Sequence, residues 1–350
     1  MTIKTTCIGA WPKPAYVRLP DWFNIPGGLD GADLTGRWKK AMEDLGPDAE
    51  AIISRGIQEV VQEQVRAGID IPTDGEVPRE NYIHYHCRHL NGFDFVNLTN
   101  REMRGGACAA NLPTISGPVS VKQLFAVEDW KRAQAYTDRP VKFTMPGPMT
   151  VSDTSADAHY HDPARLGADI ADALNREVLA LAEAGCRYIQ IDEPLFARKP
   201  AEALDYGFDN LERAFHGCPR HIERTVHMCC GYPDRLDHPD YPKADPGAYL
   251  EIADAVEASS IDAVSVEDAH RHNDLHLLEH FRTTKVIFGL VAIAKSRVEG
   301  VDEIRERLLQ VLAHIDRDRL IAAPDCGLGL LSRDLVVSKL NNLCAAARSV

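Results

Sequence analysis

The segment "YIQIDEPLF", residues 188–196, joins a short apolar run to two neighbouring carboxylates, Asp192 and Glu193. The run is continuous rather than cleanly alternating, which is typical of a strand buried on both faces of a parallel sheet. Carboxylates are costly at the end of such a strand unless they pair with or bind another group. We therefore interpret the segment as an inner strand whose carboxyl end opens onto a functional site.

Seven more segments have the same apolar, β-branched character. They cover residues 5–9, 68–73, 141–145, 224–229, 263–267, 286–290 and 320–324. Between them, residues 51–68, 173–185 and 301–315 repeat apolar side chains at a helical period, and the second of these patterns ends on Gly185, as a helix stop should. Eight strands that alternate with helices predict an α/β fold, a (β/α)8 TIM barrel, with an open doubly wound sheet as the alternative.

The stretch between the second and third expected strands, residues 74–140, is too long for a single βα unit. We interpret it as an insertion after the second strand that covers the active-site face. No internal repeat, low-complexity tract or linker rich in Pro, Gly or Ser marks a boundary elsewhere. Residues 1–350 are therefore predicted to form a single barrel domain.

The composition restricts the partners. The chain has 350 residues, 45% of them hydrophobic, and a formal net charge of −13, which argues against nucleic acid and membrane surfaces as partners. No run of about 18 apolar residues could span a bilayer, and the N-terminal segment has no apolar signal region. The nine cysteines lie at irregular spacings, which indicates reduced thiols rather than a disulfide framework. We expect a cytoplasmic protein.

Metal-binding residue types are concentrated in "TVHMCCGYP", residues 225–233. Alternate strand residues project on the same side, so His227 and Cys229 should point together while Cys230 points away. Glu267 and Cys326 follow other expected strands, whose ends meet at the same face of a barrel. One imidazole, two thiolates and a carboxylate suit a tetrahedral zinc site. The alternative is that these cysteines are ordinary buried side chains.

Zinc held by thiolates has a particular use. It is a poor activator of water, but it can keep a substrate thiol deprotonated near neutral pH. A thiolate held in this way is a nucleophile for alkyl transfer. The residues therefore predict Zn²⁺ as the cofactor and a small thiol as the substrate.

Several motifs, in order along nearly the whole chain, resemble those of a known family. The family is the cobalamin-independent methionine synthases, in their catalytic C-terminal half, within the uroporphyrinogen decarboxylase/methionine synthase barrel superfamily. The motifs are "TTCIGAWPKP" (5–14), "TDGEVPRENYIHYHCRHLNGFDF" (73–95), "MPGPMTV" (145–151), "YIQIDEPLF" (188–196), "HMC" (227–229), "VSVED" (264–268) and "PDCGLG" (324–329).

The resemblance implies roles for individual residues. Zinc would be bound by His227, Cys229, Glu267 and Cys326. Glu76 and Asp192 would bind the amino group of homocysteine, and Asp192 would also take part in catalysis. Ile8 and Ala10, in the segment that opens the barrel, would lie at the substrate.

The residue types alone leave alternatives open. Glu76 and Asp192 are cation holders, and each could instead form a strand-end ion pair with Arg79 or Arg187. The histidines of "AHRHNDLH", residues 269–276, are expected mainly in a solvated loop.

Other positions depart from the family's pattern. The serine that helps to hold the substrate carboxylate is replaced by Ala10. The histidine proposed as proton donor falls at Ala294, and the candidate catalytic replacements are Lys295 beside it, Asp153 and His270. Positions that handle the folate are occupied by Ala109, Ala110, Thr154 and Arg198 or a neighbour. The family's N-terminal half, which helps to bind polyglutamyl folate, has no counterpart. The residues expected to activate the thiol are therefore better preserved than the residues expected to handle the methyl donor.

We predict a zinc-dependent S-methyltransferase that methylates homocysteine to methionine. The methyl donor is methyltetrahydrofolate or, given these departures, a sulfonium or a methyl-corrinoid, with a corrinoid protein as a possible partner. Three alternatives are alkyl transfer to another thiol such as coenzyme M, a non-enzymatic docking subunit for a corrinoid protein, and a lyase similar to uroporphyrinogen decarboxylase.

Overall fold

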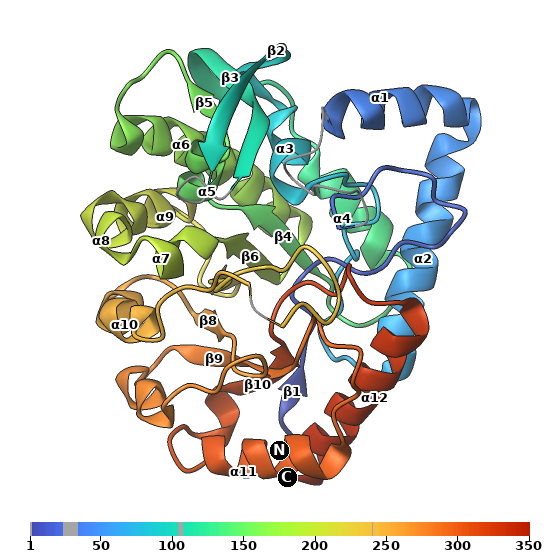
Figure 1. Cartoon of the computed structure of the whole chain (residues 1–350), viewed down its shortest axis with the longest axis vertical. Helices are drawn as coiled ribbons and strands as arrows, with labels where there is room; N and C mark the ends of the chain where they lie inside the picture. The colour runs from blue at the N-terminus through green and yellow to red at the C-terminus, as the bar shows by residue number, and fades with distance from the viewer. Residues whose placement is uncertain (1, 24–33, 104–107, 240) are drawn as a thin grey trace.

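Parallel strands curl around the centre of the molecule, and helices surround them (Figure 1). In this computed structural model, which describes residues 2–23, 34–103, 108–239 and 241–350, one seven-stranded sheet has the order β1-β10-β9-β8-β7-β6-β4. Its strands are β1 Lys4–Thr5, β4 Lys142–Pro146, β6 Tyr188–Asp192, β7 Glu223–His227, β8 Ala263–Val266, β9 Lys285–Val291 and β10 Leu320–Pro324. Every neighbouring pair in this sheet is parallel.

The second expected strand, residues 68–73, is present only as two single bridges. Thr6, next to β1, pairs with Ile71, and Thr73 pairs with Lys142 of β4, both in parallel. Residues 71–73 therefore lie between the two edge strands and close the sheet into a barrel. The predicted α/β barrel is confirmed, and the open doubly wound alternative is not formed.

The helices follow local signals in the sequence. Helix α6 begins after Asp162, whose carboxylate accepts the backbone N–H groups of Ala164 and Arg165, and it ends at Gly185, where φ is +99°. The helices are α1 Leu34–Leu45, α2 Ala49–Ala67, α3 Tyr82–Cys87, α4 Ala126–Gln134, α5 Pro148–Asp153, α6 Pro163–Ala184, α7 Pro194–Arg198, α8 Pro200–Glu202, α9 Phe208–Ala214, α10 Ala248–Ala258, α11 Val301–Val311 and α12 Arg333–Ser349. Shorter helical turns are η2 Gly46–Asp48, η4 Ala203–Gly207, η5 Leu275–His280 and η6 Arg317–Arg319.

The stretch 74–140, predicted as one insertion over the active-site face, divides into three parts. Residues 74–87, which include α3, follow the bridged segment 71–73, which takes the place of the second barrel strand. The strands β2 (Leu90–Met103) and β3 (Cys108–Val121) form an antiparallel hairpin that β5 (Ala156–Asp157) extends, and β3 packs on α6. Helix α4 packs against α2, α6 and β4, as an ordinary outer helix of the barrel does (Figure 1).

Two apolar clusters hold the barrel together. The larger lies between the sheet and the outer helices, where Ile53, Ile57, Val60 and Val61 form the buried face of α2. The smaller consists of Ile8, Ala263, Ile287, Ile321 and Ala323. Four of these five residues belong to β8, β9 and β10, and Ile8 follows β1 by three residues.

The described helices are too short or too polar to cross a bilayer. The cysteines for which the structure describes a side chain are all free thiols, as expected for a chain without a disulfide framework.

Candidate functional site

A pocket opens at the carboxyl ends of the barrel strands, with about 870 Å³ of empty space including its mouth. Most of the residues predicted for the site line it together: Ile8, Ala10, Glu76, Asp192, His227, Cys229 and Cys326. These residues come from segments far apart in the sequence. The barrel therefore brings the strand-end groups to one place, which is where barrel enzymes bind their substrates.

His227, Cys229 and Cys326 form a compact trio. One ligand atom from each, a ring nitrogen and two sulfurs, lies within 4.8 Å of the others. His227 and Cys229 are buried, and Cys326 is half-buried. The Nε2 atom of His227 is 3.3 Å from Sγ of Cys326, while its Nδ1 contacts the Ser265 hydroxyl. The contact with Ser265 orients the imidazole so that Nε2 faces the two sulfurs, which is the usual role of an outer partner of a metal-binding histidine.

The two sulfurs differ in their tendency to ionise. A hydrogen bond from Cys326, followed by one from His227, holds the pKa of Cys229 well below its usual range. The same contact with the Cys229 thiolate, together with burial, raises the pKa of Cys326. The trio thus stabilises a negative sulfur inside the protein, as a metal-binding thiol requires.

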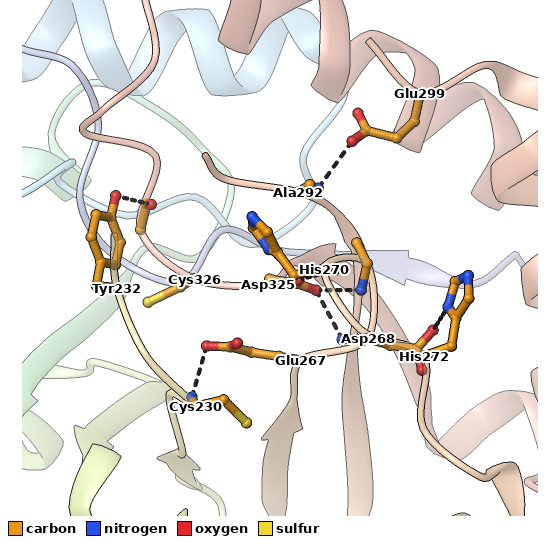
Figure 2. A network of polar contacts seen from close by, with 12 residues as sticks. Cys230, Tyr232, Glu267, Asp268, His270, His272, Ala292, Glu299, Asp325 and Cys326 are labelled. Carbon is orange, nitrogen blue, oxygen red and sulfur yellow. Dashed lines mark hydrogen bonds and ion pairs between the residues drawn. The ribbon is translucent and has the colours of Figure 1, made fainter. Parts of the chain in front are cut away.

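Glu267 lies beside this trio but is not one of its three members. Its Oε1 accepts the backbone N–H of Cys230 at 3.0 Å (Figure 2). Burial, and next the Cys229 thiolate, raise the pKa of Glu267 well above its usual range, so the carboxyl feels the sulfur charge directly. The Cys230 side chain stays apart, as predicted, and burial raises its pKa to about 11.

Asp325 connects the segments that carry Glu267 and Cys326. Its Oδ1 accepts the backbone N–H groups of Asp268 and Ala269, both at 2.9 Å, and its Oδ2 accepts the backbone and ring N–H of His270, both at 2.8 Å (Figure 2). His270 is therefore a buried partner of Asp325, with 4% of its side chain exposed, and not part of a solvated loop as the sequence suggested. Asp325 fixes the turn after β8 to the turn after β10.

Glu76 is held in an unusual backbone conformation. Its φ is +55°, in the left-handed region that non-glycine residues seldom adopt and that is frequent at functional sites. Its Oε1 accepts the Thr144 hydroxyl at 3.0 Å and lies 3.5 Å from Arg79, so the ion pair considered from the sequence exists. A Cβ at Gly9 would lie only 2.6 Å from this oxygen, which explains the glycine.

The Glu76 carboxyl retains one oxygen for a ligand. Its Oε2 makes no hydrogen bond within the described part of the chain, and the residue lines the pocket. Burial is the main reason why the pKa of Glu76 rises to about 7; Arg79 opposes the rise and Asp192 adds to it. A cation placed between Glu76 and Asp192 would relieve both the burial and the mutual repulsion.

Asp192 is positioned from inside the barrel. Lys142 donates to Oε1 of Gln190 at 2.6 Å, and Nε2 of Gln190 donates to Oδ1 of Asp192 at 2.7 Å and to the carbonyl of Ile8 at 2.9 Å. Burial raises the pKa of Asp192 to about 6. Its neighbour Glu193 instead accepts the N–H groups of Met149 and Thr150 and thereby holds the start of α5.

Lys295 does not reach the pocket. It is exposed and lines a separate hollow with His270 and Arg307. Ala294 is buried beside it and is not a lining residue. Of the three groups considered as replacements for a proton donor, only Asp153 lines the pocket, where Lys199 forms an ion pair with it at 2.7 Å.

Aromatic side chains form a wall of the pocket that the sequence did not reveal. Trp22 lies near Phe23, Tyr82 and Tyr232, with ring centroids 4.7, 5.8 and 6.0 Å away. Trp22 and Phe23 follow the first strand by more than ten residues, and no periodic pattern marks them. Only the fold brings these rings beside the trio and makes this part of the pocket apolar.

Comparison with known proteins identifies the family of this barrel. The family described as "Cobalamin-independent synthase, Catalytic domain" matches residues 3–349. The chain belongs to this family. A solved structure of a B12-independent methionine synthase from Shewanella sp. W3-18-1, in complex with selenomethionine, is 32% identical, with a TM-score of 0.85 over 99% of this chain and 97% of that one.

Archaeal relatives are similar over the same length. The methionine synthase of Pyrococcus furiosus is 28% identical over 99% of this chain and 93% of its own. That of Saccharolobus solfataricus is 27% identical over 99% of this chain and 95% of its own. The predicted family and the predicted enzyme class, an S-methyltransferase of the cobalamin-independent methionine synthases, are confirmed. The lyase and the non-enzymatic docking subunit are therefore set aside.

Proposed function

We propose that this chain methylates homocysteine to methionine, with the substrate thiol activated at the trio of His227, Cys229 and Cys326. Membership of the methionine synthase family supports the reaction. The selenomethionine named with the Shewanella relative is an analogue of methionine, which supports the product. The observation that carries the proposal is that the carboxylates of Glu76 and Asp192 and the sulfur-rich trio line one pocket.

The residues of the trio fit a zinc ion. One imidazole nitrogen and two sulfurs face one another within 4.8 Å, and the contact of Nδ1 with the Ser265 hydroxyl orients the imidazole. We propose Glu267 as the fourth protein ligand, because its buried carboxyl already interacts with Cys229. Zinc bound here would act as a Lewis acid that favours the deprotonated form of a substrate thiol.

The two carboxylates would orient the amino acid. Glu76 and Asp192 each direct a buried carboxyl at the pocket, and together they suit an ammonium group. This arrangement favours homocysteine over coenzyme M, which has no ammonium group to place between them. Asp192 forms the end of β6 beside His227 of β7, so the amino group and the thiol of one small molecule could bind at the same time.

The proposed function is tested with purified, zinc-loaded protein. Methionine should form from homocysteine and a methyl donor, and zinc should be present at one ion per chain. Absence of methionine with every donor tried, or full activity in protein from which a chelator has removed all metal, would refute the proposal.

The proposal for the methyl donor rests on which of the predicted donor-handling positions line the pocket and which do not. Ala294 and Lys295 lie outside it, and Ala109 and Ala110 belong to the β2–β3 hairpin and are not lining residues. Transfer of a methyl group from a tertiary amine such as methyltetrahydrofolate requires a proton on the departing nitrogen. We propose that a methyl-corrinoid or a sulfonium, which needs no such proton, is the better donor.

We expect a donor of this kind to exceed methyltetrahydrofolate by more than about tenfold in kcat/KM, equivalent to ~1.4 kcal/mol in the barrier. Methylcobalamin, a methyl sulfonium and methyltetrahydrofolate should be assayed with homocysteine on one zinc-loaded preparation. Efficient turnover with methyltetrahydrofolate alone would show that the folate is handled by groups at other positions than 109, 110, 294 and 295, with Asp153 as the first residue to examine.

Ligand binding should depend on the ionisation of Glu76. Because the pKa of Glu76 is raised to about 7, the carboxyl becomes neutral as the pH falls below 7, and a neutral carboxyl attracts an ammonium group less. The affinity for methionine, which has no thiol proton to lose, should therefore decrease from pH 7.5 to 5.5. Calorimetry with the metal content checked at each pH measures this, and Glu76→Gln should make the decrease smaller, leaving the part that is due to Asp192, whose pKa is raised to about 6. An equally steep profile in the variant would exclude Glu76 as the titrating group.

A further inference from the structure

Arg198 is a cation of the pocket without a partner in the described part of the chain. It is the last residue of α7, is half-buried and lines the pocket. Its guanidinium makes no hydrogen bond or ion pair with any described residue, whereas the next residue, Lys199, is paired with Asp153 at 2.7 Å. A guanidinium has five N–H donors in a planar fork, and the fork matches a carboxylate.

The position of Arg198 on its helix directs it to the same space as the other site residues. Pro194, Leu195 and Arg198 all line the pocket, and residues three and four apart lie on one face of a helix. The Arg198 charge also acts on Tyr82, another lining residue, where it opposes the rise in pKa that burial causes. Helix α7 starts two residues after Asp192, the last residue of β6. The helix face that carries Arg198 is therefore held close to the Asp192 carboxylate.

The charges of the pocket leave one part of an amino acid unmatched. Glu76 and Asp192 suit the ammonium group, but the α-carboxylate also loses water when it enters and needs a donor in return. The Ala10 side chain offers only a methyl group. Among the described lining residues, Arg198 is the one side chain with a permanent positive charge.

We propose that Arg198 binds the α-carboxylate of the thiol substrate. This inference rests on the proposed function, since it assumes that the substrate is an amino acid. The pocket then recognises the zwitterion from two sides, with Glu76 and Asp192 at the ammonium group and Arg198 at the carboxylate. The pair of contacts selects an α-amino acid thiol over a simple amine thiol.

The test compares homocysteine with 3-aminopropane-1-thiol, which is homocysteine without its carboxylate. In zinc-loaded protein, Arg198→Gln should weaken homocysteine binding by roughly ten- to a hundredfold, the usual range for a lost hydrogen bond to a charged group. Binding of 3-aminopropane-1-thiol, measured by calorimetry, should change by less than about twofold. Arg198→Lys should restore part of the affinity for homocysteine.

Arg220→Gln is the matched control, because Arg220 is exposed and precedes β7, at the opposite end of the strands from the pocket. It should leave both affinities unchanged. Equal losses for both thiols in Arg198→Gln, no loss for either, or a change confined to the KM of the methyl donor would each overturn the inference. Failure of the wild-type protein to bind homocysteine would instead refute the proposed function, so the two results are distinguishable.

Discussion

Replacing Cys229 or Cys326 with serine should remove most of the bound zinc and lower methionine synthesis by more than ~100-fold. A hydroxyl is a far poorer zinc ligand than a thiolate, and even the loss of an outer partner of a metal ligand costs 10–100-fold. In this chain the two sulfurs also share a hydrogen bond that favours the thiolate at Cys229. Either substitution leaves His227 with a single sulfur ligand beside it. Metal analysis and a homocysteine-dependent assay on the same sample measure both effects.

Cys230→Ser provides the control for these variants. Cys230 is buried next to Cys229 in sequence, but it lies outside the trio and its raised pKa of about 11 keeps it neutral. Its backbone N–H, which holds Glu267, is retained in the variant. Zinc content and activity should remain close to those of the wild type. A Cys326→Ser protein with full zinc content would show that the metal is bound elsewhere.

Glu76→Gln should weaken homocysteine binding by roughly 1–3 kcal/mol, or about 5- to 150-fold, because a charge-assisted contact to the ammonium group becomes a neutral one. Glutamine has the same shape, so the contact with Thr144 can persist and the backbone need not move. Isothermal calorimetry on zinc-loaded protein gives the affinity directly, without the methyl donor.

Glu177→Gln is a matched control for Glu76→Gln. Glu177 is also a buried carboxyl whose pKa is raised to about 7, but it accepts the N–H groups of Phe125 and Ala126 at the start of α4, outside the pocket. It can affect stability but should not alter homocysteine affinity. If Glu76→Gln binds homocysteine as tightly as Glu177→Gln does, Glu76 has no contact with the amino group.

Much of the barrel was predictable because its strands are buried on both faces. The run at 188–192 coincides with β6, and the run at 320–324 coincides with β10, because both are short, mostly apolar segments that are buried in the sheet. The run at 68–73 was harder to interpret, because its pairing is reduced to the bridges of Ile71 and Thr73. The division of residues 74–140 depends on packing of β3 and α4 against α6, which no local pattern encodes.

The candidate site was predictable where residue type and strand position agreed. His227 and Cys229 are alternate residues of one strand end, and Cys326 follows another, so their convergence follows from barrel geometry. Glu267 is adjacent to them, but its hydrogen bond to Cys230 could not be read from spacing. Lys295 was selected by analogy with a neighbouring position, and its exposure outside the pocket removes it from the proposed mechanism.

Other parts of the site depend on contacts that only the folded chain defines. A tight turn follows the bridged segment 71–73. It gives Glu76 its left-handed backbone and brings Asp74 and Arg79 together as a buried ion pair at 3.1 Å. That Arg198 has no partner among the residues that the structure describes also depends on the fold, because the sequence at 198–199 is the same whether its guanidinium is paired or not. These features concern how the amino acid is oriented, while the residue types already indicated the sulfur chemistry.

Zinc X-ray absorption spectroscopy, with and without homocysteine, tests the central claim most directly. The proposed site has two cysteine sulfurs, from Cys229 and Cys326, and binding of the substrate through its thiol should raise the number of sulfur ligands from two to three. The same sample should then form methionine when a methyl donor is added. A sulfur count that does not change on saturation with homocysteine, in protein that still makes methionine, would contradict activation of the thiol at this metal site.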